Sequence, residues 1–144
     1  MCGIVGIVGK NQAERVILNG LHRLEYRGYD SAGLFVCDEN HDYLVKSPGR
    51  IKNLEDKLTA EVTGHIGIGH TRWATHGEPT EANAHPHTSQ SGQLVLVHNG
   101  VIENFEEIHQ TYLSDHTFSG QTDTEIAVHL VEELKNRDNL TTKE

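Results

Sequence analysis

The chain opens with Met1-Cys2-Gly3-Ile4-Val5-Gly6, and the interpretation of the whole sequence depends on this stretch. If an aminopeptidase removes Met1, Cys2 carries both a thiol and a free α-amine. A terminal amine is partly neutral near pH 7 and a thiolate is a strong nucleophile, so one residue can hold nucleophile and general base. The apolar run from Ile4 to Val8 predicts a buried strand that fixes the cysteine in place. Alternatively, Met-Cys-Gly simply begins this strand, with Cys2 as a small buried hydrophobe.

The composition indicates a single acidic domain. The chain has 144 residues, 21 acidic against 12 basic side chains, and a formal net charge of −9. This balance offers no basic stripe to a phosphate backbone, so we expect no nucleic-acid partner. The two cysteines make no disulfide framework, we find no signal peptide, and no apolar run approaches the roughly 18 residues of a membrane span. We therefore expect a cytoplasmic protein with no membrane partner.

Apolar spacing and turn residues predict both strands and helices, which favours an α+β fold with a sheet covered by helices. We expect helices over 11–27, 51–58 and 104–113 and from 122 onward, with Asn11, Asn104 and Thr122 as N-caps. Gly28 should end the first helix in the left-handed conformation. Strands are expected over 4–8, 34–36, 43–45, 66–69 and 94–97, and residues 74–93 should form a loop.

Four residues outside the opening stretch carry groups that could recognise an amino acid. Arg72 follows a predicted strand and could bind a carboxylate through two parallel hydrogen bonds. Asn99 and Gly100 follow another strand and offer N–H donors for a developing oxyanion, while Asp123, in a first helical turn, could hold an ammonium group. Together with Cys2 these groups would fit free glutamine. Each also has a structural explanation, as a turn, a helix start or an ion-pair residue.

The histidines suggest a competing hypothesis. Four of the eleven, His70, His76, His85 and His87, crowd one loop region, and imidazole is a common metal ligand. No Cys-x-x-Cys pair or His-Glu-x-x-His helix accompanies them, so we expect no metal and no other cofactor. A loop ordered by hydrogen bonds, or one that gates a site, is favoured over a metal site.

Three other features have a structural and a functional interpretation. The single tryptophan, Trp73, is either a core aromatic or a wall that keeps water from reactive ammonia. Residues 26–33 form either a plain connection or a loop beside Cys2, in which Arg27 orients the chain terminus or assists the thiolate. Cys37 ends an apolar run and is predicted to be a core or sheet thiol.

Four motifs in this order resemble a known family. They are Cys2–Gly6, Arg23–Gly33, His70–Pro79 and His98–Gly100. They resemble the glutaminase domains of class II glutamine amidotransferases. The two long motifs are similar to those of the branch whose ammonia converts fructose 6-phosphate to glucosamine 6-phosphate in hexosamine biosynthesis. The similarity covers essentially the whole chain.

The resemblance implies an N-terminal-nucleophile hydrolase fold, a four-layer αββα sandwich with two antiparallel sheets. It implies that Cys2, freed of Met1, hydrolyses L-glutamine through a thioester, with its own amine as the base. Arg27 would support the nucleophile, and Asn99 and Gly100 would form the oxyanion hole. The residues implied in substrate binding are Arg72, Trp73, Thr75, His76, Gly77, His85 and Asp123, with His85 in a loop that closes over the site.

The resemblance also implies a longer protein. Residues 1–144 would be the N-terminal part of a glutaminase domain, lacking the strands that complete the second sheet and the sugar isomerase domains. In the whole protein, ammonia would pass through a channel to the isomerase domain, and the protein would form a homo-oligomer. The alternative is a catalytically inactive fragment or binding module, inactive because it is truncated or because Met1 is retained.

Overall fold

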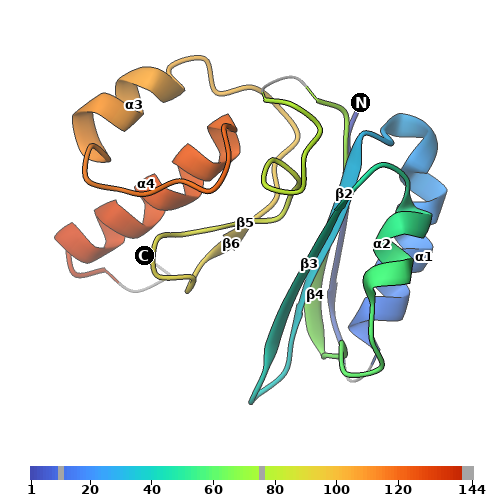
Figure 1. Ribbon diagram of the computed structural model, residues 1–144. Coiled ribbons are helices and arrows are strands. Elements are labelled where there is room, and N and C mark those ends of the chain that lie inside the picture. Colours follow the sequence, from blue (N-terminus) through green and yellow to red (C-terminus); the bar gives the residue numbers. More distant parts are fainter. Residues whose placement is uncertain (10–11, 75–76, 141–144) are drawn as a thin grey trace.

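A four-stranded antiparallel sheet forms the centre of the molecule. The computed structural model describes residues 1–9, 12–74 and 77–140. The sheet has the order β1-β4-β2-β3, built from β1 (Gly3–Val8), β2 (Ser31–Cys37), β3 (Asp42–Pro48) and β4 (Ile66–Arg72). Helices α1 (Ala13–Leu24) and α2 (Ile51–Lys57) cover one of its faces (Figure 1).

A second, smaller sheet lies on the other side of the first. It pairs β5 (His87–Thr88) with β6 (Val95–Leu96), and the helices α3 (Phe105–Tyr112) and α4 (Asp123–Arg137) lie beyond it (Figure 1). The order of layers is therefore helix, sheet, sheet, helix. The predicted α+β class with antiparallel sheets is confirmed.

The apolar core lies between the four-stranded sheet and the helices α1 and α2. Ala13, Ile17 and Leu21 recur at helical spacing on α1 and are completely buried. They pack against residues of β2 and α2, namely Leu34, Val36, Ile51 and Leu54. Because each fully buried Leu or Ile contributes about 1.5–3 kcal/mol, this cluster holds the helices on the sheet.

The strand register brings distant parts of the chain to one end of the sheet. In β4, which lies between β1 and β2, Thr71 is the partner of Gly3 in β1, and Arg72 is the partner of Ser31 in β2. The start of β1, the start of β2 and the end of β4 therefore meet. Cys2 and Arg72 are neighbours at this end because of that pairing.

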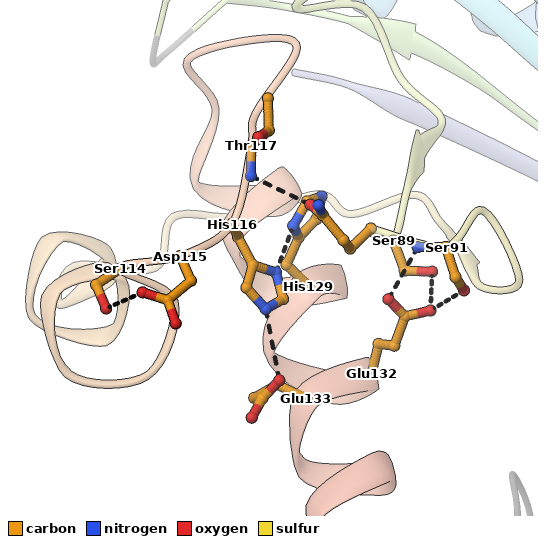
Figure 2. Close-up of polar contacts among 10 residues, drawn as sticks. Ser89, Ser91, Ser114, Asp115, His116, Thr117, His129, Glu132 and Glu133 are labelled. Carbon is orange, nitrogen blue, oxygen red and sulfur yellow. Dashed lines mark hydrogen bonds and ion pairs between the residues drawn. The ribbon is translucent and has the colours of Figure 1, made fainter.

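Polar contacts tie α4 to the loop that joins β5 and β6. The Glu132 carboxylate accepts hydrogen bonds from Ser89 Oγ at 2.6 Å and from the Ser91 backbone N–H at 3.0 Å, and a third from the Ser91 hydroxyl (Figure 2). On the same helix, His129 Nδ1 lies 3.0 Å from His116 Nδ1 (Figure 2). These contacts fix the helix whose first turn reaches the site described below.

The first predicted helix differs in its end. Helix α1 stops at Leu24 and continues as a 3₁₀ turn, Glu25–Arg27. Gly28 is extended, with φ −175°, so the predicted left-handed conformation is wrong. A side chain at Gly28 would come within 2.8 Å of the Arg72 backbone, so close packing requires the glycine here. The predicted cap Asn11 lies outside the described residues.

The other predicted caps and strands are only partly confirmed. Thr122 caps α4, since its Oγ1 accepts from the Glu125 N–H at 3.2 Å, whereas Asn104 precedes α3 without a side-chain cap bond. The predicted buried strand over 94–97 is only Val95–Leu96, and it is half-buried. Strand β5 lies within the predicted loop, because its pairing partner β6 rather than its own composition makes it a strand.

Candidate active site

A pocket of about 320 Å³ opens where the sheet strands meet. Eight of the predicted site residues line it, namely Cys2, Arg27, Arg72, Trp73, His85, Asn99, Gly100 and Asp123. They come from the residue before β1, the 3₁₀ turn, the end of β4, three loops and the first turn of α4. The prediction that these residues meet is therefore confirmed.

The thiol of Cys2 lies against the backbone of Trp73. The Trp73 N–H donates to Cys2 Sγ at 3.1 Å, and the Trp73 carbonyl oxygen is 3.5 Å from the sulfur. Arg27 Nε donates to the Cys2 carbonyl at 3.3 Å. The contacts with Trp73, the residue after β4, hold the sulfur in place. Cys2 is only half-buried and lines the pocket, so a ligand can reach it.

The stretch 26–33 packs beside this cysteine, as the functional interpretation predicted. The Asp30 N–H donates to the Arg72 carbonyl at 3.2 Å, and Asp30 Oδ2 accepts from the Ala74 N–H at 2.8 Å. Tyr29 makes an edge contact with Trp73, with ring centroids 6.3 Å apart. Trp73 is 48% exposed, so the core-aromatic interpretation is wrong and the ring stands at the pocket rim.

Two opposite charges are buried in the pocket wall. Arg72 is 3% exposed and donates to the carbonyls of Gly77 and Glu78, at 3.2 and 3.0 Å. Asp123 is 4% exposed and accepts from the backbone N–H groups of Ile102 at 2.7 Å and Thr124 at 2.9 Å. Burial lowers the pKa of Arg72, while the nearby Cys2, Asp30 and Asp123 oppose that shift. The pocket thus offers one positive and one negative group to a zwitterion.

Asn99 and Gly100 face Cys2 from the loop after β6. Asn99 Nδ2 donates to the Cys2 carbonyl at 3.1 Å, and Asn99 Oδ1 lies 2.8 Å from His70 Nε2. A carboxamide nitrogen carries two N–H groups, so the bond to Cys2 uses one of them. Gly100 is exposed in the pocket lining, where its backbone is accessible to a ligand.

The remaining predicted binding residues have different placements. Gly77 does not line the pocket but accepts from Arg72 through its carbonyl, with φ +73°. Thr75 and His76 lie outside the described residues. Apart from Met1, four lining residues were not predicted, namely His98, Val101, Thr122 and Thr124. Their signal was their position next to Asn99-Gly100 and Asp123, since neighbours of a site residue in a turn often share its pocket.

The histidines of the predicted loop form a buried cluster. The rings of His70 and His85 stack with centroids 4.1 Å apart, and His85 meets the edge of His87 at 4.7 Å. Burial lowers the pKa of His70 to about 4 and that of His87 to about 3, and it lowers the pKa of His85 as well. The rings are therefore neutral at pH 7. Among residues 1–9, 12–74 and 77–140, no three His, Cys, Asp or Glu side chains could hold a metal ion.

Two further observations concern the rest of the chain. Cys37 ends β2 as a half-buried sheet thiol, as predicted, and lies outside the pocket of Cys2. Burial raises the pKa of this thiol, and Asp42 and Asp38 add to the effect. In the part of the chain that the structure describes, no helix has the length and apolar character needed to cross a membrane.

Sequence comparison gives a family match. The profile described as "Glutamine amidotransferase domain" matches residues 53–141. The chain is 61% identical over all its 144 residues to "Glutamine--fructose-6-phosphate aminotransferase [isomerizing]" of Streptococcus agalactiae serotype III (strain NEM316). It is 60% identical over 99% of its length to the protein of that name in Lactiplantibacillus plantarum. The chain spans 24% of each of these relatives.

Structure comparison supports the same relationship. Glutamine phosphoribosylpyrophosphate amidotransferase from B. subtilis matches with a TM-score of 0.77 and 27% identity, over 96% of this chain and 32% of that one. A structure described as the allosteric regulatory enzyme of purine biosynthesis matches with a TM-score of 0.75 and 28% identity, over 96% and 33%. The predicted N-terminal-nucleophile type of fold is thereby confirmed.

Proposed function

The chain belongs to the glutamine amidotransferase domain family, and on this premise we propose that it hydrolyses L-glutamine through a thioester on Cys2. The observation that carries the proposal is the single pocket shared by Cys2, Asn99, Arg72 and Asp123. A nucleophile, an oxyanion donor and two opposite charges are the groups that this substrate needs. Glutamate and ammonia are the products.

Recognition of the substrate follows from the buried charges. Arg72 would bind the α-carboxylate of glutamine, and Asp123 would bind its α-ammonium. Both side chains are at least 96% buried, which strengthens an ion pair relative to one in water. Trp73 at the rim would cover the bound substrate. The side-chain amide of glutamine would then extend toward Cys2.

The reaction uses the two functional groups of Cys2. Its free amine takes the thiol proton, and the thiolate attacks the amide carbon of glutamine. The oxyanion that forms would be held by an N–H of Asn99 Nδ2 and by the Gly100 backbone N–H. The C–N bond then breaks, the protonated amine gives its proton to the leaving ammonia, and a thioester remains. Water, deprotonated by the same amine, attacks the thioester and releases glutamate.

This mechanism requires that Met1 be removed. While Met1 is attached, the nitrogen of Cys2 is an amide and cannot accept a proton. Met1 also lines the pocket, where Arg27 Nη2 lies 3.9 Å from its sulfur. Its removal would free the base and clear space for the substrate.

The role of the whole protein is a second part of the proposal. The relatives named glutamine--fructose-6-phosphate aminotransferase are about four times as long as this chain, since the chain spans 24% of each. We propose that ammonia from this site passes to a sugar isomerase domain, where fructose 6-phosphate becomes glucosamine 6-phosphate. Self-association of the whole protein is proposed on the family resemblance. A cytoplasmic location is proposed because a free nucleophilic thiol survives best in a reducing compartment.

Labelling of the nucleophile tests the proposal. A diazo-ketone analogue of glutamine should add once to the chain after Met1 removal, on Cys2, and should abolish ammonia release. The Cys37→Ser variant is the matched control and should be labelled like the natural chain, whereas Cys2→Ala should not. Labelling on Cys37 would contradict the proposal. Glutamine binding without ammonia release from a chain that begins at Cys2 would favour the alternative of an inactive binding module.

A further inference from the structure

His70 makes a contact that the mechanism above leaves unexplained. We propose that His70 is a positioning residue that fixes which way the Asn99 side-chain amide points, so that its N–H groups face the reacting carbonyl. The inference rests on the proposed function, because it concerns the oxyanion donor of that reaction. His70 lies on β4, is completely buried and does not line the pocket, so it acts only through Asn99.

The hydrogen bonds define the proton on the His70 ring. His70 Nε2 lies 2.8 Å from Asn99 Oδ1 and 3.2 Å from the His98 carbonyl oxygen. Both partners are amide oxygens, which only accept hydrogen bonds, so Nε2 carries the proton. His70 Nδ1 is buried and has no hydrogen-bond partner among the described residues. The ring is therefore a neutral donor aimed at Asn99.

This donor decides between the two orientations of the Asn99 amide. In the observed orientation, Oδ1 accepts from His70, and Nδ2 donates to the Cys2 carbonyl at 3.1 Å. A rotation by half a turn would place the NH₂ group against the N–H of His70 and Oδ1 against the Cys2 carbonyl oxygen. Both new contacts would be repulsive. The observed orientation is the one that presents N–H groups to an oxyanion beside Cys2.

The His70 ring is itself held in place. It stacks on His85 with an angle of 14° between the rings, and His85 Nδ1 accepts from the His98 N–H at 3.4 Å. The stack needs Gly33, the β2 partner of His70, because a Cβ there would lie 2.1 Å from the His85 carbonyl oxygen. The stack therefore holds the His70 ring in the position from which it donates to the Asn99 side chain.

Kinetics of variants in the full chain test the proposal. His70→Leu should lower kcat for ammonia release by about 10–100-fold, because a misdirected oxyanion donor loses most of its effect. KM should change by less than about threefold, since the contacts to the ends of glutamine are untouched. His70→Gln keeps an N–H donor and should recover at least about fivefold of the lost kcat. His41→Leu replaces an exposed histidine of the loop between β2 and β3, outside the pocket, and should leave kcat within about twofold.

A double variant shows whether His70 acts through Asn99. Asn99→Ala should lower kcat by about 10²–10³-fold. Adding His70→Leu to Asn99→Ala should then have no further effect, because the group that His70 orients is gone. An equal loss of kcat from His70→Leu in both backgrounds would overturn the proposal, as would a rise in KM at unchanged kcat.

A spectroscopic measurement keeps the test independent of activity. The Asn99 side-chain ¹⁵NH₂ signals, assigned by their loss in Asn99→Ala, should move in His70→Leu toward those of exposed asparagines, and His70→Gln should restore them. Unchanged signals in His70→Leu would overturn the inference even if activity fell. If the natural chain beginning at Cys2 released no ammonia, the proposed function would fail, and the Asn99 signals would still decide whether His70 sets the amide.

Discussion

Asp123→Asn is the substitution that most sharply probes substrate recognition. It keeps the size of the side chain and removes its charge, at a position that is 4% exposed. A hydrogen bond to a charged group is worth about 1.5–3 kcal/mol, so kcat/KM for glutamine should fall by about 10–150-fold. The change should appear mainly in KM, because the α-ammonium is remote from the amide that reacts.

A substrate analogue isolates the predicted contact. Glutaramate, the glutamine analogue without the α-amine, should react with the natural chain about as poorly as glutamine reacts with Asp123→Asn. The variant itself should hardly distinguish the two substrates. Ammonia release measures all four combinations. Equal losses of kcat/KM for both substrates on substitution would refute the assignment of Asp123 to the ammonium group.

The same substitution has a predicted cost in stability. The Asp123 carboxylate accepts from Ile102 and Thr124, and an asparagine would turn its NH₂ group toward one of these N–H donors. A buried donor without a partner costs about 1–3 kcal/mol, which urea unfolding would measure as a lower free energy of unfolding. Asp115→Asn is the matched control at an exposed position and should change neither the free energy of unfolding nor kcat/KM for glutamine.

Two further predictions concern the buried histidines His70, His85 and His87. The folded-state pKa values of His70 and His87, about 4 and about 3, lie below the ordinary 6.5, so only the unfolded chain takes up these protons as pH falls below about 6.5. The free energy of unfolding should therefore fall by about 1.4 kcal/mol per pH unit for each ring as the pH is lowered from 6.5 to 4. In His87→Gln it should fall less steeply. A slope unchanged by this substitution would contradict the low folded-state pKa of His87. Gly33→Ala should lower the free energy of unfolding by about 1–3 kcal/mol, since its Cβ would lie 2.1 Å from the His85 carbonyl oxygen. Gly6→Ala is the control and should be tolerated, because the nearest atom to its Cβ would be 3.8 Å away. Equal effects of the two substitutions in urea unfolding would contradict the close packing at Gly33.

Local patterns in the sequence were sufficient to predict most helices. The spacing of Ala13, Ile17 and Leu21 gave α1 its buried face, and Thr122 capped α4 as expected. Local signals failed where contacts from elsewhere decide the conformation. Gly28 is required by the nearby Arg72 backbone and not by a helix end, and β5 is a strand because β6 lies beside it.

The candidate site was likewise predictable only where local sequence signals were sufficient. Cys2, Arg72, Asn99 and Asp123 could be selected from the sequence because each has a characteristic chemistry next to a predicted strand or helix end. Their meeting depends on β1 pairing with β4, which no local pattern specifies. The bond between His70 and Asn99 joins residues 29 positions apart, so the sequence could favour histidines held by hydrogen bonds over a metal site but could not predict which group His70 contacts.

The proposed mechanism depends on the free amine of Cys2 as the base of the reaction, and blocking this amine is the direct test. The chain can be produced with a leader peptide that a specific protease removes immediately before Cys2, with intact mass confirming each form. We expect no ammonia release from glutamine before cleavage and full activity after it, in the same sample. Equal hydrolysis by the blocked and the cleaved chain would show that the Cys2 amine is not the base.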